Sequence, residues 1–362
     1  MQALILVGGH GTRLRPLTLT LPKPVVPLVD RPFIRYMVDW LAHHGVDDVV
    51  MACGFLAGGV REVLGEGGDG GPRLRYVEEP DARGTAGAIK FAEELLEDRF
   101  LALNGDVLTD LDLTALMALH DEREATATLA LYPVDDPSAY GLVRRESDGE
   151  IREFLEKPSP DQIDTDEISA GAYVLEKSVL DLVPEGKEVS IEREVFPKLV
   201  GNGLYGRRLE GYWMDIGTPE RYLQASWDIL ERRAQTDTGE RLDADGLLVE
   251  DDVEVADGAE ITAPTLIETR SKVAAGARVG ARAVVGTGSE IGERAVIEES
   301  AIHRGARIGT EAEIRGAILA AGVAVGDGAS IEPGAVVGEG ARIAAGARVA
   351  GDARVGPGED FG

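Results

Sequence analysis

Three closely spaced glycines and three cationic side chains follow a short apolar run near the start of the chain. They lie in the stretch VGGHGTRLRPLTLTLPKPVVP, Val7 to Pro27. Backbone amides in a glycine-rich turn can approach an anion, and arginine and lysine side chains neutralise phosphate charge. Prolines on both sides of Lys23 stiffen the segment that carries it. The pattern predicts a phosphate-binding loop, in which the expected contacts are Gly8, Gly9, Gly11, Arg13 and Lys23.

The glycine spacing differs from two well-known phosphate loops. A dinucleotide-binding fingerprint, G-x-G-x-x-G, would need a third glycine where Leu14 stands. A P-loop would need a Gly-Lys-Ser/Thr ending, which is missing here. The loop therefore indicates phosphate chemistry of a different kind.

Two aspartates far apart in the sequence are candidate metal ligands. Asp106 follows the strand-like segment Phe100–Leu103 in an Asn-Gly-Asp turn, and Asp215 ends the strand-like run beside Trp213. Carboxylates at strand ends near phosphate suit Mg²⁺, which prefers oxygen ligands. Asn-Gly-Asp is also common turn chemistry, so the spacing alone leaves a structural role open.

Composition excludes several classes of function. The net charge of −28 argues against nonspecific binding to nucleic acid or to an anionic membrane surface. The single cysteine, Cys53, excludes an intramolecular disulfide framework and a cysteine-based zinc site. No apolar run reaches the roughly 18 residues needed to span a bilayer, and the N-terminus lacks the pattern of a signal peptide. We expect a cytoplasmic protein with no nucleic-acid or membrane partner.

The first 231 residues alternate strand-like and helix-like segments. Such alternation predicts an α/β fold, with a Rossmann-like mixed and mostly parallel sheet covered by helices on both faces. Ligands of such sheets bind beyond the carboxyl ends of the strands, where the glycine loop and Asp106 both lie. The expected strands are Ala3–Val7, Asp48–Ala52, Leu74–Val77, Phe100–Leu103, Thr126–Tyr132, Leu142–Arg145, Ile151–Glu156 and Ala170–Leu175, and the expected helices include Phe33–His43, Ala86–Leu96 and Leu113–His120.

The pattern changes after a polar, non-periodic segment at 232–246, which we interpret as a linker between a catalytic domain (1–231) and a second domain (247–358). Aliphatic residues there recur every six positions, a period that fits neither a helix nor a flat strand. It predicts a hexapeptide β-helix, with one shortened corner at each of two breaks (297 to 308 and 314 to 325). The periodic positions are Val255, Ile261, Ile267, Val273, Val279, Val285, Ile291, Ile297, Ile308, Ile314, Val325, Ile331, Val337, Ile343, Val349 and Val355.

Taken together, these motifs resemble the sugar-1-phosphate nucleotidyltransferases, also called nucleotide-sugar pyrophosphorylases. The opening loop, "EEPDARGTAGAI", "LNGDV", "EKP" and "WMDIGT" cover the whole catalytic half. "DPSAYGLV", "SIEREVFPKL" and "GYWMDIGTPERYLQA" are most similar to mannose-1-phosphate guanylyltransferases, many of which carry a C-terminal left-handed β-helix.

The resemblance implies that a nucleoside triphosphate and a sugar 1-phosphate give a nucleotide sugar and pyrophosphate, with Mg²⁺ as cofactor. The sugar phosphate is already ionised, so no general base is needed, and alignment and charge neutralisation must supply catalysis. GTP and mannose 1-phosphate are the favoured pair. Glucose 1-phosphate with dTTP or UTP is the alternative. A non-catalytic regulatory subunit is a further one, although Arg13, Lys23, Asp106 and Asp215 are all present.

The resemblance also assigns roles by position. Arg13 would neutralise the leaving pyrophosphate, Lys23 would reach the α-phosphate or the sugar phosphate, and Lys157 would hold the sugar phosphate. Ser169 replaces an asparagine of the family pattern, which puts the identity of the sugar in doubt. The implied nucleotide contacts are Leu6, Gly8, Gly9, Gly11, Thr12, Glu79, Gly84 and Thr85; the implied sugar-phosphate contacts are Gly105, Glu156, Lys157, Ser169 and Gly171; the implied metal ligands are Asp106 and Asp215.

Three roles are open for the β-helix. We favour an assembly module through which the chain forms a homo-oligomer. An effector-binding module is the second alternative. An acyltransferase is the third, since hexapeptide helices often carry such sites; the one histidine of this half is His303, at a break in the period.

Overall fold

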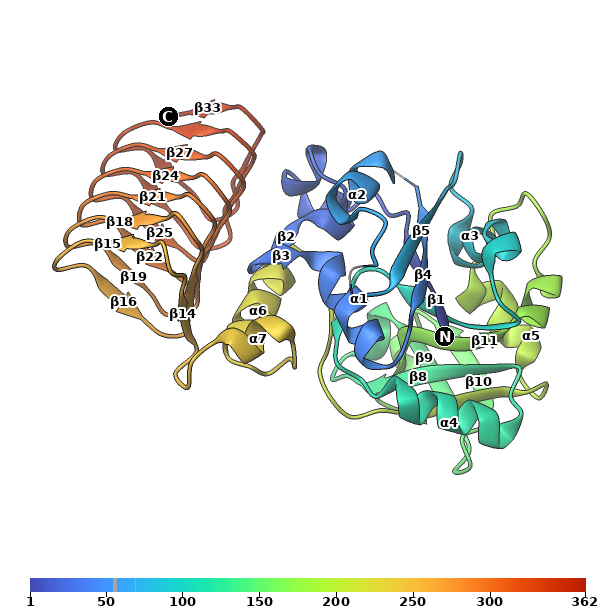
Figure 1. Ribbon diagram of the computed structural model, residues 1–362. Coiled ribbons are helices and arrows are strands. Elements are labelled where there is room, and N and C mark those ends of the chain that lie inside the picture. The colour runs from blue at the N-terminus through green and yellow to red at the C-terminus, as the bar shows by residue number, and fades with distance from the viewer. Residues whose placement is uncertain (55–56, 69) are drawn as a thin grey trace. The chain divides into compact units, whose positions relative to one another are not determined.

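The computed structural model in Figure 1 describes residues 1–54, 57–68 and 70–362. Contacts between Cα atoms divide the chain into two compact units. Unit 1 consists of Met1–Gly9 and Met37–Trp213, and unit 2 of His10–Tyr36 and Met214–Gly362. Each unit has a hydrophobic core of its own.

A nine-stranded mixed sheet is the centre of the described part of unit 1. Its order is β10-β9-β11-β6-β1-β4-β5, and β8 pairs with β11 and β12. The run β6-β1-β4-β5 is parallel, whereas β11 is antiparallel to β6, β8 and β9. The strands are β1 (Gln2–Val7), β4 (Asp48–Cys53), β5 (Arg73–Glu78), β6 (Arg99–Asn104), β8 (Ala127–Pro133), β9 (Gly141–Arg145), β10 (Ile151–Glu156), β11 (Glu167–Glu176) and β12 (Leu204–Arg208).

Helices cover both faces of this sheet. Ala86 and Ile89 of α3 (Gly84–Phe91) share a core cluster with Leu4 of β1 and Leu129 of β8. The neighbouring side chain on β8, Thr128, points to the other face, since side chains alternate along a strand. There its hydroxyl lies 2.9 Å from Nδ1 of His120 on α4 (Leu113–Arg123). The predicted α/β fold is confirmed.

Further short elements complete unit 1. They are α2 (Ala57–Leu64), the 3₁₀ helix η4 (Glu93–Leu95), β7 (Val107–Thr109), 3₁₀ turns at Pro137–Ala139, Pro160–Gln162 and Lys177–Leu182, a π-helical turn at Ile191–Val195 and α5 (Phe196–Leu199). Helix α1 (Phe33–His43) and strand β13 (Trp213–Asp215) lie where the chain passes between the two units.

Unit 2 begins with the segment that follows Gly9 in the sequence. Three 3₁₀ turns, η1 (Thr12–Leu14), η2 (Leu17–Leu19) and η3 (Lys23–Val25), lead into a short hairpin of β2 (Pro27–Leu28) and β3 (Arg31–Pro32). Two helices, α6 (Pro219–Leu230) and α7 (Asp237–Arg241), precede the repeat region. Helix α7 lies within the segment expected as a linker. Its Thr238 is fully buried, and the Thr238 hydroxyl donates to Asp30 at 2.7 Å.

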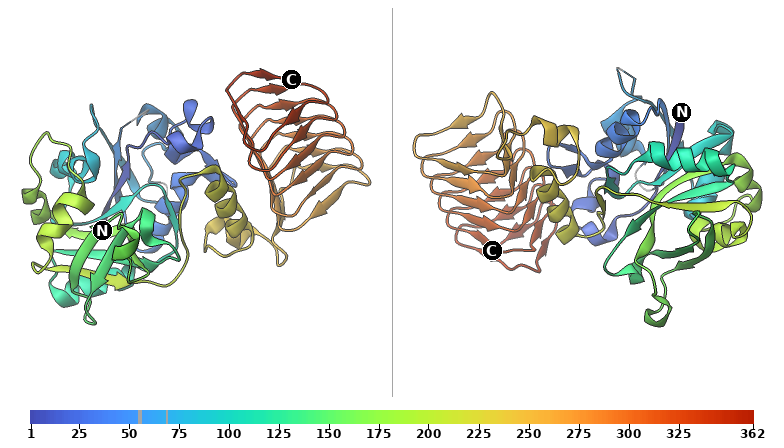
Figure 2. Two further views of the ribbon diagram at one scale, coloured as in Figure 1. Left: turned by 180° about the vertical axis from the view of Figure 1, so that it is seen from behind. Right: turned by 90° about the horizontal axis from the view of Figure 1, so that it is seen from below.

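The repeat region is a β-helix of three parallel sheets, all of whose residues are described (Figures 1 and 2). Aliphatic side chains stack inside it as the six-residue period predicted. Its strands are β14 (Leu247–Val249), β17 (Thr265–Ile267), β20 (Ala283–Val285), β23 (Ala301–Ile302), β26 (Ile318–Leu319), β29 (Val336–Val337) and β32 (Arg354–Val355) in one sheet; β15 (Glu254–Val255), β18 (Lys272–Val273), β21 (Glu290–Ile291), β24 (Arg307–Ile308), β27 (Ala324–Val325), β30 (Arg342–Ile343) and β33 (Asp360–Phe361) in the second; and β16 (Glu260–Thr262), β19 (Arg278–Gly280), β22 (Val296–Glu298), β25 (Glu313–Arg315), β28 (Ser330–Ile331) and β31 (Arg348–Val349) in the third.

Both breaks of the period fall at the same corner of consecutive coils. One lies between β22 and β23, and the other between β25 and β26. Pairing of the strands continues through both coils, because Ile297 still aligns with Ile314 and Ile302 with Leu319. The missing residue is therefore absorbed by the corner, as predicted from the sequence.

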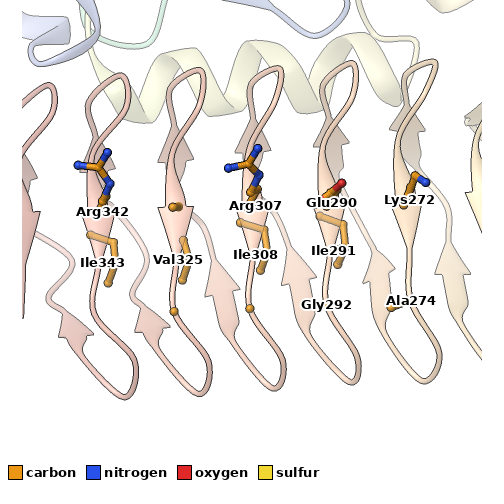
Figure 3. A pocket seen from close by; sticks show the side chains of 13 residues that line it. Lys272, Ala274, Glu290, Ile291, Gly292, Arg307, Ile308, Val325, Arg342 and Ile343 are labelled. Carbon is orange, nitrogen blue, oxygen red and sulfur yellow. The ribbon is translucent and has the colours of Figure 1, made fainter.

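One face of the β-helix carries a groove of about 510 Å³ (Figure 3). Charged side chains from successive coils line it, among them Lys272, Glu290, Arg307 and Arg342. Small residues such as Ala274 and Gly292 also line the groove and leave its space open. In the described part of the chain, no helix has the length and apolar character required to cross a bilayer.

Candidate active site

Gly8 and Gly9 follow β1 directly, at the edge of the sheet where the parallel strands β1, β4 and β6 end. A Cβ on Gly8 would lie 3.6 Å from the Gly54 amide nitrogen and 3.7 Å from Oε1 of Glu79. Burial raises the pKa of Glu79, against the opposing charge of Arg83. Unit 1 thus places Leu6, Gly8 and Glu79, three expected nucleotide contacts, at one end of the sheet.

Gly11 is the point of close packing in the part of the loop that belongs to unit 2. Its φ of 57° is left-handed, and a Cβ there would lie 2.9 Å from Cγ2 of Thr18 and 3.0 Å from Cβ of Lys23. The Thr18 hydroxyl donates to the Gly11 carbonyl at 2.8 Å. Any larger residue at Gly11 would displace the stem of Lys23, so the glycine fixes where the lysine leaves the backbone.

Arg13 and Asp215 come from distant parts of the sequence to neighbouring positions in unit 2. The Arg13 guanidinium lies on the backbone of Gly217, two residues after Asp215, where a Cβ would come within 2.6 Å of Nη2. Oδ2 of Asp215 accepts from Nη1 of Arg221 at 3.0 Å, and the carboxylate is mostly buried. Thr12 and Arg13 are exposed, so the loop presents them to solvent.

Asp106 lies in the turn after β6, held by glycines with no room for a side chain. The Gly105 amide donates to the Leu6 carbonyl at 2.9 Å, and a Cβ on Gly105 would come within 2.6 Å of that oxygen. On β11, Gly171 has a φ of 74°, and a Cβ there would meet Nδ2 of Asn104 at 2.8 Å. Gly105 and Gly171 therefore let backbone and side chains close around the turn that carries Asp106.

Glu156 and Lys157 lie at the end of β10. Lys157 has a left-handed φ of 53°, its amide donates to the Tyr140 carbonyl at 2.9 Å, and its side chain is exposed. Burial raises the pKa of Glu156, and the negative charge of Glu192 adds to the shift, against Arg193 and Lys157. Two carboxylates beside a lysine form a group that suits sugar hydroxyls and a phosphate.

Sequence reasoning missed Glu192, which lies on the π-helical turn of unit 1. Its carboxylate accepts from the Thr85 hydroxyl at 2.8 Å, from the Ser190 hydroxyl at 2.9 Å and from the Tyr173 hydroxyl at 3.3 Å. The Thr85 hydroxyl also accepts from the Ile191 amide at 2.8 Å. The side chain of Thr85 therefore orients Glu192. The motif "SIEREVFPKL" contained Glu192 without indicating its contacts.

An aromatic group beside the sugar motif was also missed. Nε1 of Trp213 donates to the Ala170 carbonyl at 2.8 Å, next to Ser169 on β11. The Trp213 ring lies 5.7 Å from that of Tyr132 and 5.4 Å from that of Tyr140. Tyr140 is the residue whose carbonyl holds Lys157, so the aromatic group and the Glu156-Lys157 pair are joined through it.

Asp106 in unit 1 and Asp215 in unit 2 each have the chemistry of a ligand for a magnesium ion that is shared with substrate. Among the described residues, no group of three or more histidine, cysteine, aspartate or glutamate side chains could enclose a metal. Mg²⁺ in phosphoryl-transfer sites is commonly held by one or two carboxylates together with phosphate oxygens and water. Asp106 and Asp215 supply carboxylates of this kind, each at the end of a strand-like run.

Comparisons with known proteins identify the family of the chain. The model of the nucleotidyl transferase family matches residues 2–232, and that of the EIF2B subunit epsilon LbH domain matches residues 245–349. The mannose-1-phosphate guanylyltransferase of Mycobacterium tuberculosis is 39% identical over 258 residues, 69% of this chain and 71% of that protein. The UTP–glucose-1-phosphate uridylyltransferase of a Synechocystis species is 36% identical over 64% of each chain. The crystal structure of HddC from Yersinia pseudotuberculosis superposes with a TM-score of 0.54 and 28% identity, covering 62% of this chain and 97% of that one.

This chain therefore belongs to the nucleotidyl transferase family. The predicted class, a sugar-1-phosphate nucleotidyltransferase with a C-terminal left-handed β-helix, is confirmed.

Proposed function

We propose that this protein transfers the guanylyl group of GTP to mannose 1-phosphate, giving GDP-mannose and pyrophosphate. A phosphate oxygen of mannose 1-phosphate attacks the α-phosphorus of GTP, and the bond to the β-phosphate breaks as pyrophosphate leaves. The observation that carries the choice of substrates is the 39% identity to a mannose-1-phosphate guanylyltransferase over 69% of this chain.

The residues have separate tasks in this proposal. Arg13 neutralises the leaving pyrophosphate, Lys23 the α-phosphate, and Lys157 the phosphate of the sugar. Asp106 and Asp215 would hold Mg²⁺, which would supply positive charge to offset that of the phosphates. The backbones of Gly8, Gly9, Gly11, Thr12, Gly84 and Thr85, together with Leu6 and Glu79, contact the nucleotide; Gly105, Glu156, Ser169 and Gly171 contact the sugar phosphate.

Glucose 1-phosphate with UTP or dTTP is the second candidate, because a uridylyltransferase is 36% identical over 64% of this chain. A panel of four nucleoside triphosphates against four sugar phosphates, followed by pyrophosphate release, tests both. The highest kcat/KM for GTP with mannose 1-phosphate supports the first. A preference for UTP or dTTP with glucose 1-phosphate overturns it, and the absence of turnover with every pair favours a regulatory subunit.

The expected homo-oligomer is also a proposal, formed by the β-helix face with the groove. On that face Glu290 lies beside Arg307 of the next coil, so two antiparallel copies could pair their charges. Light scattering of the full chain tests this proposal. A mass of one chain at micromolar concentration would contradict it.

A further inference from the structure

A buried chain of hydrogen bonds runs from the β-helix to the segment that carries Lys23, entirely within unit 2. The Tyr222 hydroxyl on α6 donates to the carbonyl of Pro27, four residues after Lys23. Nε2 of His303, the residue after β23, lies 3.0 Å from the same hydroxyl. Both side chains are buried, with 2% of Tyr222 and 7% of His303 exposed.

The direction of these hydrogen bonds follows from the number of protons. A tyrosine hydroxyl has one proton, and here it points to the Pro27 carbonyl, which can only accept. The tyrosine oxygen must then accept from His303, whose Nε2 carries a hydrogen. Burial, with the nearby charge of Arg304, lowers the pKa of His303 to about 4, so the ring is neutral at physiological pH. A buried, neutral donor of this kind is a poor candidate for the base of an acyltransferase.

Tyr222 also lies close to Lys23, on the wall of a shared cavity. The two residues line the same small cavity of about 10 Å³, together with Val26 and Leu28. A space of this size holds at most one water molecule, so the lysine stem has little freedom to move on this side. Lys23 itself is only 9% exposed.

The segment between Lys23 and Pro27 is short and stiff. The Val25 amide donates to the Pro22 carbonyl at 3.0 Å, and the Val26 amide to the Lys23 carbonyl at 3.2 Å. Two hydrogen bonds within five residues transmit a restraint at Pro27 back to the lysine.

A second connection holds the β2–β3 hairpin at Asp30, the residue before β3. The Tyr36 hydroxyl lies 3.0 Å from both the Leu28 carbonyl oxygen and Oδ1 of Asp30. Oδ2 of Asp30 accepts from Arg241 of α7 at 2.8 Å, and Arg241 also donates to Glu250 of the first coil at 2.7 Å. The β2–β3 hairpin is thus tied to the repeat region at Pro27, through Tyr222, and at Asp30, through Arg241.

We propose that Tyr222 and His303 are positioning residues for Lys23, so that the β-helix takes part in catalysis by setting where that lysine lies. The inference rests on the proposed function, in which Lys23 neutralises phosphate during the transfer. Neither residue touches substrate; they act through the Pro27 carbonyl and the packing around the lysine.

A double-mutant cycle on the full chain tests the inference. Tyr222→Phe keeps the ring and removes both hydrogen bonds, so kcat should fall about tenfold with KM for both substrates nearly unchanged. In a Lys23→Ala background the same substitution should change kcat by less than about twofold, because its effect passes through the lysine. Equal losses in the two backgrounds, or an unchanged kcat for Tyr222→Phe alone, would overturn the inference.

Variants at His303 provide a second readout should Tyr222→Phe fold poorly. His303→Gln retains a side-chain amide donor for the Tyr222 hydroxyl, whereas His303→Leu has none, so the glutamine variant should keep several times more activity. Arg282→Gln is the matched control: Arg282 contacts Glu231 and stacks on Trp227 between the β-helix and α6, but does not reach the Lys23 segment. A loss at Arg282 as large as at His303 would count against the inference. Full activity of Lys23→Ala would instead overturn both the proposed role of the lysine and the inference.

Discussion

The guanidinium of Arg13 lies on the backbone of Gly217, where a Cβ would come within 2.6 Å of Nη2 and 2.8 Å of Cζ. The glycine of the "WMDIGT" motif thus leaves room for the first arginine of the opening loop, 204 positions earlier in the chain. Two motifs that the sequence presents as separate signatures are one packing unit.

Gly217→Ala should therefore lower kcat by about tenfold with little loss of stability. The methyl group would meet the end of a flexible side chain, which can turn away without disturbing the core. Steady-state kinetics and thermal melting measure the two effects. Gly58→Ala is the control, since a Cβ on this exposed helical glycine meets nothing within 4 Å and should leave kcat unchanged. Unchanged kinetics of Gly217→Ala would contradict a role of the Arg13 position in catalysis.

Asp106→Asn should reduce kcat by about 100-fold or more, because an amide is a much weaker ligand for Mg²⁺ than a carboxylate. The fold should be intact, since Asp106 lies in a turn and contributes little to the core. Turnover across a magnesium titration and far-UV circular dichroism provide the measurements. Near-normal turnover at every magnesium concentration would exclude Asp106 as a ligand.

Glu192→Gln should shift the acid side of the pH profile for the sugar phosphate to lower pH. Burial and the charge of Glu192 raise the pKa of Glu156. When the pH falls, Glu156 is therefore protonated at a higher pH than an ordinary glutamate. Removal of the neighbouring charge favours the ionised form and lowers that pKa. The KM for mannose 1-phosphate, measured between about pH 4 and pH 8, reports the shift. An unchanged pH profile of KM would show that the charge of Glu192 does not affect the ionisation of Glu156.

His303 should make the stability of the folded chain depend on pH. Its pKa is lowered from 6.5 to about 4, chiefly by burial, so between these values the unfolded chain binds a proton that the folded chain does not. The free energy of unfolding therefore falls as pH falls through this range, by about 3 kcal/mol from this residue. His303→Gln has no titrating ring and should decline less steeply in urea unfolding experiments. Parallel declines for the two proteins would show that another group is responsible.

Local pattern was sufficient to predict eight of the nine strands of the main sheet and three helices, whereas β12, α2, α5, α6 and α7 were not predicted. The segment Phe33–His43 forms α1 between the predicted residues, because its apolar positions recur at helical spacing and nothing interrupts them. The helix predicted at Ala86–Leu96 ends earlier, at Phe91, and continues as the 3₁₀ helix η4. The six-residue period located the β-helix and the corner that absorbs its breaks, since both depend only on neighbouring coils.

Functional contacts between distant segments could not be predicted from the sequence. Glu192 gains its place from Thr85, 107 residues away, and no local pattern links a π-helical turn to the start of α3. Thr238, in the segment taken for a linker, is buried and donates to Asp30, 208 positions away in the sequence. In the sequence, Tyr222 is one residue of a motif and His303 is an isolated histidine. The fold places the Tyr222 hydroxyl between His303 and the Pro27 carbonyl.

Arg241 donates to Asp30 with one arm of its guanidinium and to Glu250 with the other. Arg241 and Glu250 lie nine positions apart, and a longer or shorter segment between them would give up one of these two partners. A repeat module taken from another protein and fused after α7 would need an acidic residue at the position of Glu250 in its first coil. The repeats are in this sense matched to Asp30 near the start of the chain, and chimeras without this match would lose the restraint on the β2–β3 hairpin before they lost their fold.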